Sequence, residues 1–185
     1  MHPIYSISGY PGSGKSTLCQ LIHDNYGFEY ISYDDFEGLT SLSLSGLDEW
    51  IKSDMPLDAL RSGEFTKKIK ASALNGPVVI ESPLGPLHLD EGITIDVSIW
   101  LEVSLDTALL RAMHKILMDE WGSVDILQDW FSGYKEAYET FVRRSLLKQR
   151  YQVGDKCDIV LDASSDIQNI FAKAESILDI KRFTT

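Results

Sequence analysis

The sequence predicts an α/β fold, in which helices cover both faces of a parallel β-sheet. Apolar runs of strand length alternate along the chain with segments whose apolar residues have helical spacing. The first run is followed at once by a glycine-rich loop and a helix, and the run at residues 77–80 is apolar throughout, as in strands buried on both faces. Connections of this kind are right-handed crossovers between parallel strands.

Length and composition indicate one domain. The chain has 185 residues, of which 44% are hydrophobic, so we expect a single domain over residues 1–185. The net charge of −11 argues against a nucleic-acid partner, because binding to a phosphate backbone uses clustered Lys and Arg. The start of the chain has neither an apolar run of about 18 residues nor a basic segment before an apolar one, so we expect no membrane partner, no signal peptide and a cytoplasmic protein.

The first strand, at residues 4–8, leads into the pattern G-x-x-x-x-G-K-S at residues 9–16, a phosphate-binding P-loop. Backbone N–H groups of such a loop, opening onto a helix N-terminus, form a concave site for phosphates because they have no partner within the helix. Lys15 is expected to reach the β- and γ-phosphates of ATP, and Ser16 to bind Mg²⁺. The alternative is a Gly/Ser-rich turn with an exposed lysine. The candidate nucleotide-binding residues are Gly9, Gly12, Ser13, Gly14, Lys15, Ser16 and Thr17.

An acidic pair, Asp34 and Asp35, follows the second predicted strand at residues 28–32. Ligands of an open α/β sheet gather at the carboxyl ends of its strands, so the pair is expected on the same edge as the P-loop. A carboxylate there can accept the proton of a substrate hydroxyl that attacks the γ-phosphate, or hold Mg²⁺ through water. The pattern favours Asp34 over Asp35 for this function. An N-cap or a solvated turn is the alternative.

A loop is predicted at residues 37–46, followed by a helix that Pro56 ends and a second helical stretch at residues 57–73. Trp50 lies at helical spacing, which fits either the core or the wall of a ring-binding pocket. Arg61 is a candidate for binding a phosphate or carboxylate of an acceptor, and a solvated arginine is the alternative.

The third strand, at residues 77–82, has an acid directly after its apolar run. Glu81 resembles a Walker B acid, which binds Mg²⁺ through water or orients the attacking group. A packing role would leave a desolvated carboxylate without a partner, which is costly. The loop at residues 83–92 is expected over the acceptor side, with His88 as a weak ligand candidate.

A fourth strand at residues 97–103 precedes two helical stretches, one from residue 105 and one at residues 123–151, and the second holds the densest basic cluster of the chain. In phosphoryl transfer, cations on a closing element stabilise the charge of the migrating group. Charge complementarity at a helix C-terminus is the alternative. The candidates, which rank equally, are Arg111, Arg143 and Arg144.

The fifth strand is predicted at residues 157–162 and the last helix at residues 166–180, with the turn at 162–164 placed against the adenine. Cys19 and Cys157 lack the spacing of metal ligands and are expected to be structural core residues.

The chain resembles P-loop nucleoside and small-molecule kinases, with uridine kinase-like and nicotinamide riboside kinase-like proteins nearest. The resemblance rests on the P-loop, the acidic segment at residues 33–36, Glu81, the basic helix from Arg111 and the strand at residues 158–160. The resemblance implies a three-layer P-loop NTPase fold, a five-stranded sheet in the order 2-3-1-4-5, a helical lid near residues 111–151, and ATP with Mg²⁺. In this family Asp34 matches the general base and Glu81 the acid of the third strand. The chain departs from it in a short segment between Phe36 and Pro77, and in Met113, His114 and Lys115, where relatives often carry arginines.

The sequence therefore predicts an enzyme that moves the γ-phosphate of ATP to a hydroxyl of a small-molecule acceptor, with a nucleoside as one candidate. Two alternatives stay open: a nucleoside monophosphate kinase, for which Arg61 is the only obvious acceptor-side arginine, and a non-kinase ATP-binding regulatory module. The identity of the acceptor and the oligomeric state are not specified by the sequence. The predicted catalytic residues are Lys15, Asp34, Glu81, Arg111, Arg143 and Arg144, and the predicted metal ligands are Ser16, Asp34 and Glu81.

Overall fold

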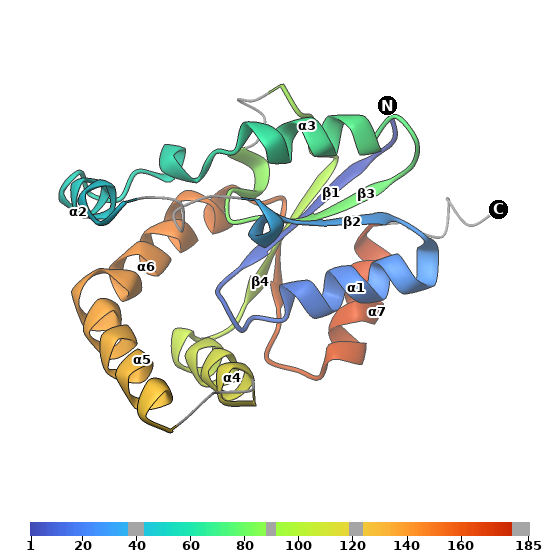
Figure 1. Ribbon diagram of the computed structural model, residues 1–185. Coiled ribbons are helices and arrows are strands. Elements are labelled where there is room, and N and C mark those ends of the chain that lie inside the picture. Colours follow the sequence, from blue (N-terminus) through green and yellow to red (C-terminus); the bar gives the residue numbers. More distant parts are fainter. Residues whose placement is uncertain (37–42, 88–91, 119–123, 179–185) are drawn as a thin grey trace.

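A computed structural model describes residues 1–36, 43–87, 92–118 and 124–178. Five parallel strands form one sheet in the order β2-β3-β1-β4-β5 (Figure 1). The predicted α/β class and strand order are therefore confirmed. The strands are β1 (Ile4–Gly9), β2 (Glu29–Ser32), β3 (Val78–Glu81), β4 (Val97–Glu102) and β5 (Ile159–Asp162).

The register of the central strands brings the candidate residues to one edge of the sheet. In β3, Glu81 pairs with Ile7 of β1 on one side and with Ser32 of β2 on the other. The loop after β1 and the turn after β2 therefore both begin beside Glu81. This is the edge at which open α/β sheets bind ligands.

Helices cover both faces of the sheet, because side chains of successive strand residues point to opposite faces. The helices α1 (Lys15–Tyr26) and α7 (Ile167–Leu178) pack on one face, against Tyr5 and Ile7 of β1. The helix α3 (Gly63–Ser72) packs on the other face, against Ile4. Figure 1 shows the resulting three layers.

A helical segment connects β4 to β5. It contains α4 (Leu105–Met118), α5 (Val124–Ala137), a π-helical turn η5 (Tyr138–Val142) and α6 (Arg143–Gln152). In Figure 1, α5 and α6 form an arc that stands off the sheet and reaches toward α2 (Leu44–Lys52). The predicted helices between the fourth and fifth strands are present, with residues 119–123 outside the described part of the chain.

Two predictions on the segment before α3 need correction. The helix α2 begins within the predicted loop, because Ser43 acts as its N-cap and accepts a hydrogen bond from the N–H of Gly46 (3.1 Å). The predicted second helix is divided into a 3₁₀ turn η3 (Leu57–Leu60) and α3, because Ser62 caps a new helix and accepts from the N–H of Phe65.

The strand β5 begins at Ile159, two residues later than predicted. A 3₁₀ turn η6 (Gly154–Lys156) precedes it, and the N–H of Cys157 donates to Val153 O (3.1 Å), so this residue belongs to the turn. Burial raises the pKa of Cys157 to about 12. Burial also raises the pKa of the fully buried Cys19, and both shifts support structural roles for the two thiols. Among the described helices, none has the length and hydropathy needed to cross a bilayer.

Candidate active site

The loop between β1 and α1 has the backbone conformation of an anion-binding cradle. Gly9, Gly12 and Gly14 have φ values of 151°, 84° and 100°, which favour glycine. A Cβ atom on Gly12 would lie 2.1 Å from the carbonyl oxygen of Ala108, because α4 packs directly on the loop. The N–H of Ser13 donates to Tyr10 O (3.0 Å) and closes the turn. Glycine is thus required at position 12 both by conformation and by space.

Two side chains of this loop fit a bound phosphate. The hydroxyl of Ser13 is buried and has no hydrogen-bond partner among the described residues. Such a group normally finds a partner, and a phosphate oxygen would supply one. The Nζ atom of Lys15 donates to Tyr10 O (3.1 Å) and lies 3.6 Å from Glu81 Oε1, so its charge is held at the mouth of the cradle. The residues present fit a nucleoside triphosphate.

Glu81, at the end of β3, is buried and held by two hydroxyl groups. Ser16 Oγ donates to Glu81 Oε1 (3.1 Å), and Tyr30 OH donates to Oε2 (2.6 Å). Burial, followed by the hydrogen bond to Glu81, raises the pKa of Tyr30, so its phenol stays a neutral donor. The donors keep the carboxylate in place beside Lys15 and the P-loop.

The pair Ser16 and Glu81 fits Mg²⁺ as ligands. Hard oxygen donors suit this ion, which takes one or two protein groups and fills its other positions with phosphate oxygens and water. No group of three or more His, Cys, Asp or Glu side chains with metal-site geometry occurs in the part of the chain that the structure describes. A magnesium ion here would therefore depend on the nucleotide for much of its coordination.

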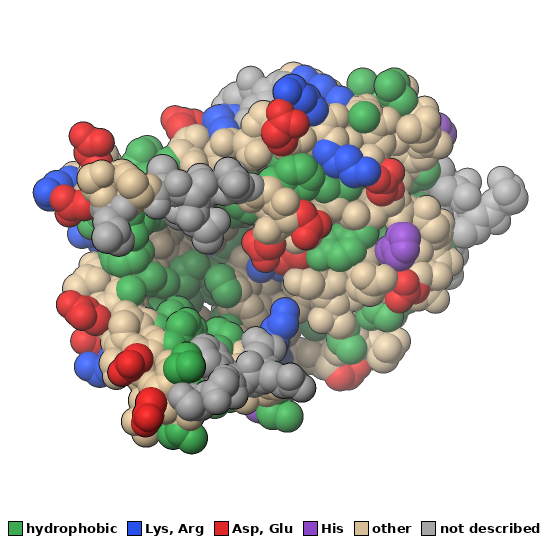
Figure 2. All heavy atoms as spheres, viewed as in Figure 1, with side chains coloured by type: hydrophobic (Ala, Val, Ile, Leu, Met, Phe, Trp, Pro, Cys, Tyr) green, Lys and Arg blue, Asp and Glu red, His purple; other side chains and the backbone are tan. Residues whose placement is uncertain are grey.

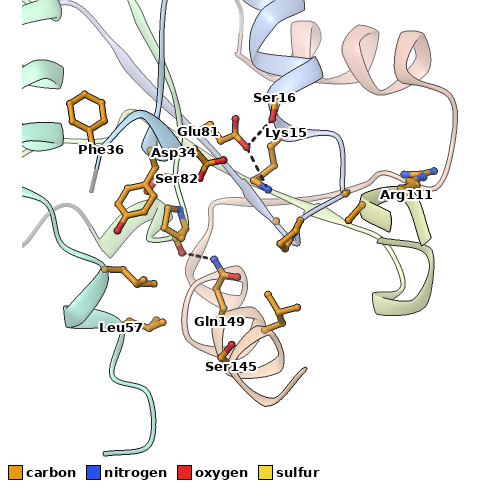
Figure 3. Close-up of a pocket in the computed structure, with 18 of the residues that line it drawn as sticks. Lys15, Ser16, Asp34, Phe36, Leu57, Glu81, Ser82, Arg111, Ser145 and Gln149 are labelled. Carbon is orange, nitrogen blue, oxygen red and sulfur yellow. Dashed lines mark hydrogen bonds and ion pairs between the residues drawn. The ribbon is translucent and has the colours of Figure 1, made fainter. Parts of the chain in front are cut away.

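Asp34 lies in the 3₁₀ turn η1 (Tyr33–Asp35), directly after β2. The hydroxyl of Ser32 caps this turn and accepts from the N–H of Asp34 (3.3 Å). The carboxylate of Asp34 is exposed and lines the same cavity as Lys15, Ser16 and Glu81 (Figure 3). Asp35 is not among the residues that line it.

The cavity beside these groups has a volume of about 690 Å³, a size that suits a small molecule. One part, which we call the donor half, is lined by the P-loop residues Gly9, Gly12, Lys15 and Ser16. The other part, which we call the acceptor half, is lined mainly by apolar and aromatic side chains, and Figure 2 shows the hollow with hydrophobic atoms around it. The lining residues of the acceptor half include Phe36, Trp50, Met55, Leu57, Leu60, Leu146, Ser145 and Gln149.

Trp50 belongs both to the core and to the cavity wall, the two alternatives that the sequence left open. Its ring is buried, and its Nε1 donates to Pro56 O (3.1 Å). Met55, in the same turn, is buried and has a left-handed backbone (φ 52°), and the exposed Asp54 before it has a left-handed backbone too (φ 61°). Left-handed backbone is uncommon in residues other than glycine, and the cases that occur cluster at ligand-binding and active sites.

A second cavity, of about 440 Å³, lies on the other side of the P-loop. It is lined by residues 12–17 of the loop and by Ser165, Asp166, Ile167 and Ile170 at the start of α7. The turn at residues 162–164, predicted to contact the adenine, precedes these residues directly. The space beside the start of α7 is therefore available for a nucleotide base, one step further along the chain than predicted.

The predicted arginines differ in position. Arg111 lines both cavities and donates to Ala163 O (3.1 Å), and Lys115, one turn later on α4, lines both as well. Arg143 and Arg144 are exposed on α6 and are not among the lining residues. Arg61 pairs with Asp58 (2.9 Å) and is not among the lining residues either. His88 lies outside the described residues.

Several residues of the site were not predicted. The sequence places Tyr30 and Ser82 only in strands and Gln149 only in a helical stretch, and it singles out nothing at Met55. Their contributions depend on contacts between distant segments, such as the hydrogen bond from Gln149 Nε2 to Pro83 O (2.9 Å), which joins α6 to the end of β3. Only the alternation in β2 could have indicated that Tyr30 and Ser32 share the face opposite to that of Ile31.

No family model matches the chain. Among curated proteins, it is 30% identical to a cytidylate kinase of Halobacterium salinarum over 60% of this chain and 58% of that protein. It is 21% identical to a cytidylate kinase of Methanocaldococcus jannaschii over 95% of this chain and 97% of that protein. The chain thus spans less than two thirds of the first of these relatives and nearly all of the second.

Solved structures show the same fold. A sugar kinase from Janibacter matches with a TM-score of 0.58 at 17% identity, covering 97% of this chain and 96% of its own. A gluconokinase from Sinorhizobium meliloti matches with a TM-score of 0.54 at 16% identity, covering 97% and 92%. At these identities the likeness establishes the fold alone, a parallel sheet between two layers of helices.

Proposed function

We propose that this protein is an ATP-dependent kinase that phosphorylates a hydroxyl group of a small, uncharged metabolite. The observation that carries the proposal is the meeting of two carboxylates, Asp34 and Glu81, with Lys15 and Ser16 of the P-loop at one cavity. A nucleotide-binding loop alone would support only binding. A carboxylate beside it that faces a second, apolar compartment supports transfer to an acceptor.

The P-loop would hold the triphosphate through backbone N–H groups, the Ser13 hydroxyl and Lys15. Ser16 and Glu81 would hold Mg²⁺. When bound, Mg²⁺ neutralises charge on the β- and γ-phosphate oxygens. Tyr30 acts as a positioning residue, because its hydrogen bond keeps Glu81 in one orientation.

Asp34 is proposed as the general base. Its carboxylate would accept the proton of the acceptor hydroxyl while that oxygen forms a bond to the γ-phosphorus. The bond from the γ-phosphorus to the bridging oxygen breaks, and ADP leaves with the bonding electrons. An exposed carboxylate on the cavity suits this task, because it is free to approach a bound hydroxyl.

The segment from α4 to α6 is proposed as a lid. Arg111 and Lys115 line both cavities, so we assign to them the neutralisation of the migrating phosphoryl group. Arg143 and Arg144, which are solvent-exposed on α6, would contribute only after this segment closes further.

The apolar and aromatic lining of the acceptor half supports an uncharged acceptor with a flat ring, of which a nucleoside is the best candidate. The resemblance to uridine kinase-like proteins supports the same choice. A nucleoside monophosphate kinase is the second candidate, because the sequence relatives are cytidylate kinases. A monophosphate acceptor would need cations on the acceptor side. Among the described residues, the cations that line this cavity are Lys15 on the P-loop and Arg111 and Lys115 on α4, and Arg61 is paired with Asp58.

The test is ADP release in the presence of ATP and Mg²⁺ with cytidine, uridine, CMP, UMP and gluconate as separate acceptors. We expect release that depends on cytidine or uridine, with a phosphorylated nucleoside as the second product. Release that depends only on CMP or UMP would support the second candidate. Release that no acceptor changes would replace both with the non-kinase ATP-binding regulatory module.

A further inference from the structure

Gln149 is a buried amide in the wall of the acceptor half. It lies on α6 with only 8% of its surface exposed, and it lines the cavity together with Ser145 and Leu146 of the same helix. Burial of an amide is costly unless its hydrogen-bonding groups find partners. A glutamine at this position therefore has to be explained by what it binds.

One end of the amide is held by the protein. Its Nε2 donates to the carbonyl oxygen of Pro83 at 2.9 Å (Figure 3). A carbonyl oxygen can only accept, so this contact determines which end of the amide is nitrogen and which is oxygen. The amide group thus has one orientation, in which Nε2 is bound to Pro83 and Oε1 is the other terminal atom.

Among the described residues, the second end has no hydrogen-bond partner. None of the hydrogen bonds among the described residues involves Oε1 of Gln149, and the side chain lies on the cavity surface. The hydroxyls nearby are used locally: Ser145 Oγ donates to Val142 O (2.9 Å), and Ser82 Oγ accepts from the N–H of Leu84 (3.1 Å). Oε1 is therefore an oriented acceptor in a mainly apolar wall.

We propose that Gln149 is a specificity-determining residue, whose Oε1 accepts a hydrogen bond from an N–H or O–H group on the ring of the phosphate acceptor. An acceptor with such a donor satisfies this oxygen on the cavity wall. An acceptor that presents a carboxylate, a phosphate or only lone pairs instead places negative charge against the partial negative charge of Oε1. This inference rests on the proposed function in one respect, namely that the cavity holds the acceptor.

Two probes test it in the unmodified protein. Uridine has an N–H donor on its ring at position 3, and 3-methyluridine has a methyl group there. We expect the wild-type enzyme to show a KM for uridine at least about tenfold lower than for 3-methyluridine, the effect of one buried hydrogen bond. Equal KM values, or failure of both probes to bind, would overturn the inference.

The variant Gln149→Met keeps the length of the side chain and removes the acceptor oxygen. We expect its KM for uridine to rise about tenfold, to near that for 3-methyluridine, with kcat changed by less than about threefold and the KM for ATP unchanged. The control Gln152→Met lies on the exposed side of the same helix and should behave as wild type. If Gln149 served only to hold Pro83, the variant would lose activity on both nucleosides equally and keep the preference, which would contradict the proposal.

Equilibrium binding by calorimetry, with a non-hydrolysable ATP analogue present, separates the two proposals. Preferential binding of uridine that depends on Gln149, without phosphorylated product, would retain the subsite and remove the kinase function. Phosphorylation of CMP or gluconate that is insensitive to Gln149→Met would retain the kinase and remove the subsite.

Discussion

The two halves of the cavity are built in different ways. The donor half is lined by residues of one contiguous loop, among them Gly9, Gly12, Lys15 and Ser16, and the backbone conformation of that loop shapes the binding surface. The acceptor half consists of side chains from separate segments, among them Trp50, Leu57 and Gln149. Because every nucleotide presents the same phosphates, a backbone surface is sufficient on one side. An acceptor is distinguished by shape and hydrogen bonding, which require side chains, so substitutions in the two halves should affect different kinetic constants.

Asp34 lies where the two halves meet, and its replacement has the largest expected effect on rate. The variant Asp34→Asn keeps the shape of the side chain but cannot accept the hydroxyl proton. We expect kcat to fall by about 10²- to 10⁴-fold, while ATP binding is retained. Steady-state kinetics and calorimetric titration with ATP measure the two quantities.

The matched control is Asp35→Asn, because the neighbouring carboxylate is exposed but does not line the cavity. It should retain kcat within about threefold. Unchanged turnover in Asp34→Asn would remove this residue from the mechanism, and a loss confined to Asp35→Asn would transfer the role to its neighbour.

Gly12 tests how closely the donor half depends on backbone geometry. The variant Gly12→Ala adds a Cβ atom 2.1 Å from Ala108 O at a residue with φ 84°, so both the loop and α4 must shift. We expect a loss of about 2–4 kcal/mol in the free energy of unfolding, together with weaker ATP binding. Denaturant unfolding followed by circular dichroism measures the stability.

Two glycines separate conformation from space. Gly27, at the end of α1, has φ 68° with nothing within 4 Å of an added Cβ, so Gly27→Ala should cost only about 1–2 kcal/mol for the left-handed backbone. Gly76 has neither a positive φ nor a neighbour within 4 Å, and Gly76→Ala should be within about 0.5 kcal/mol of wild type. A Gly12→Ala variant as stable as Gly27→Ala would mean that α4 moves away freely.

This difference in construction also explains what could be predicted from the sequence. The P-loop was predictable because its residues are contiguous, and the position of Glu81 because an acid directly follows the apolar run of a buried strand. Sheet order followed from the family resemblance and is confirmed. Apart from Trp50, the wall of the acceptor half was not predictable, because contacts such as that of Gln149 with Pro83 join residues 66 positions apart in the sequence. The start of α2 was missed although Ser43 carries an N-cap signal, since the Ser- and Gly-rich composition around it also fits a loop.

Leu57 tests the acceptor half on its own. Its side chain is half-buried, packs against the edge of both core clusters and lines the cavity (Figure 3), so Leu57→Ala removes apolar contact with a bound acceptor as well as some core packing. We expect the KM for the acceptor to rise about tenfold, which corresponds to roughly 1.4 kcal/mol of lost apolar contact, with the KM for ATP unchanged. The control Leu110→Ala removes a leucine that is 70% exposed on α4 and should change neither constant. A parallel rise in the KM for ATP would show that the two halves are coupled.

The smallest expected effect concerns the ion pair that joins the two sides of the acceptor half. Lys148 of α6 binds Asp54 Oδ2 at 2.8 Å, in the left-handed turn next to Met55, and this hydrogen bond lowers the pKa of the Asp54 carboxyl below its ordinary value of 3.8. A carboxyl whose pKa is lower in the folded state contributes stability above its unfolded pKa and loses it as the pH falls through the folded pKa. The variant Asp54→Asn, which tolerates the left-handed backbone equally well, should therefore melt about 1 °C below wild type at pH 7, and the difference should vanish as the pH falls below 3.8. Thermal melts of both proteins across this range measure it, and 1 M salt, which screens exposed charges, should remove the difference at pH 7. A difference in melting temperature that persists in acid and in 1 M salt would mean that the ion pair is not its cause. The turn would then be held by its backbone and by Trp50, and the ion pair would contribute nothing to closing the acceptor half.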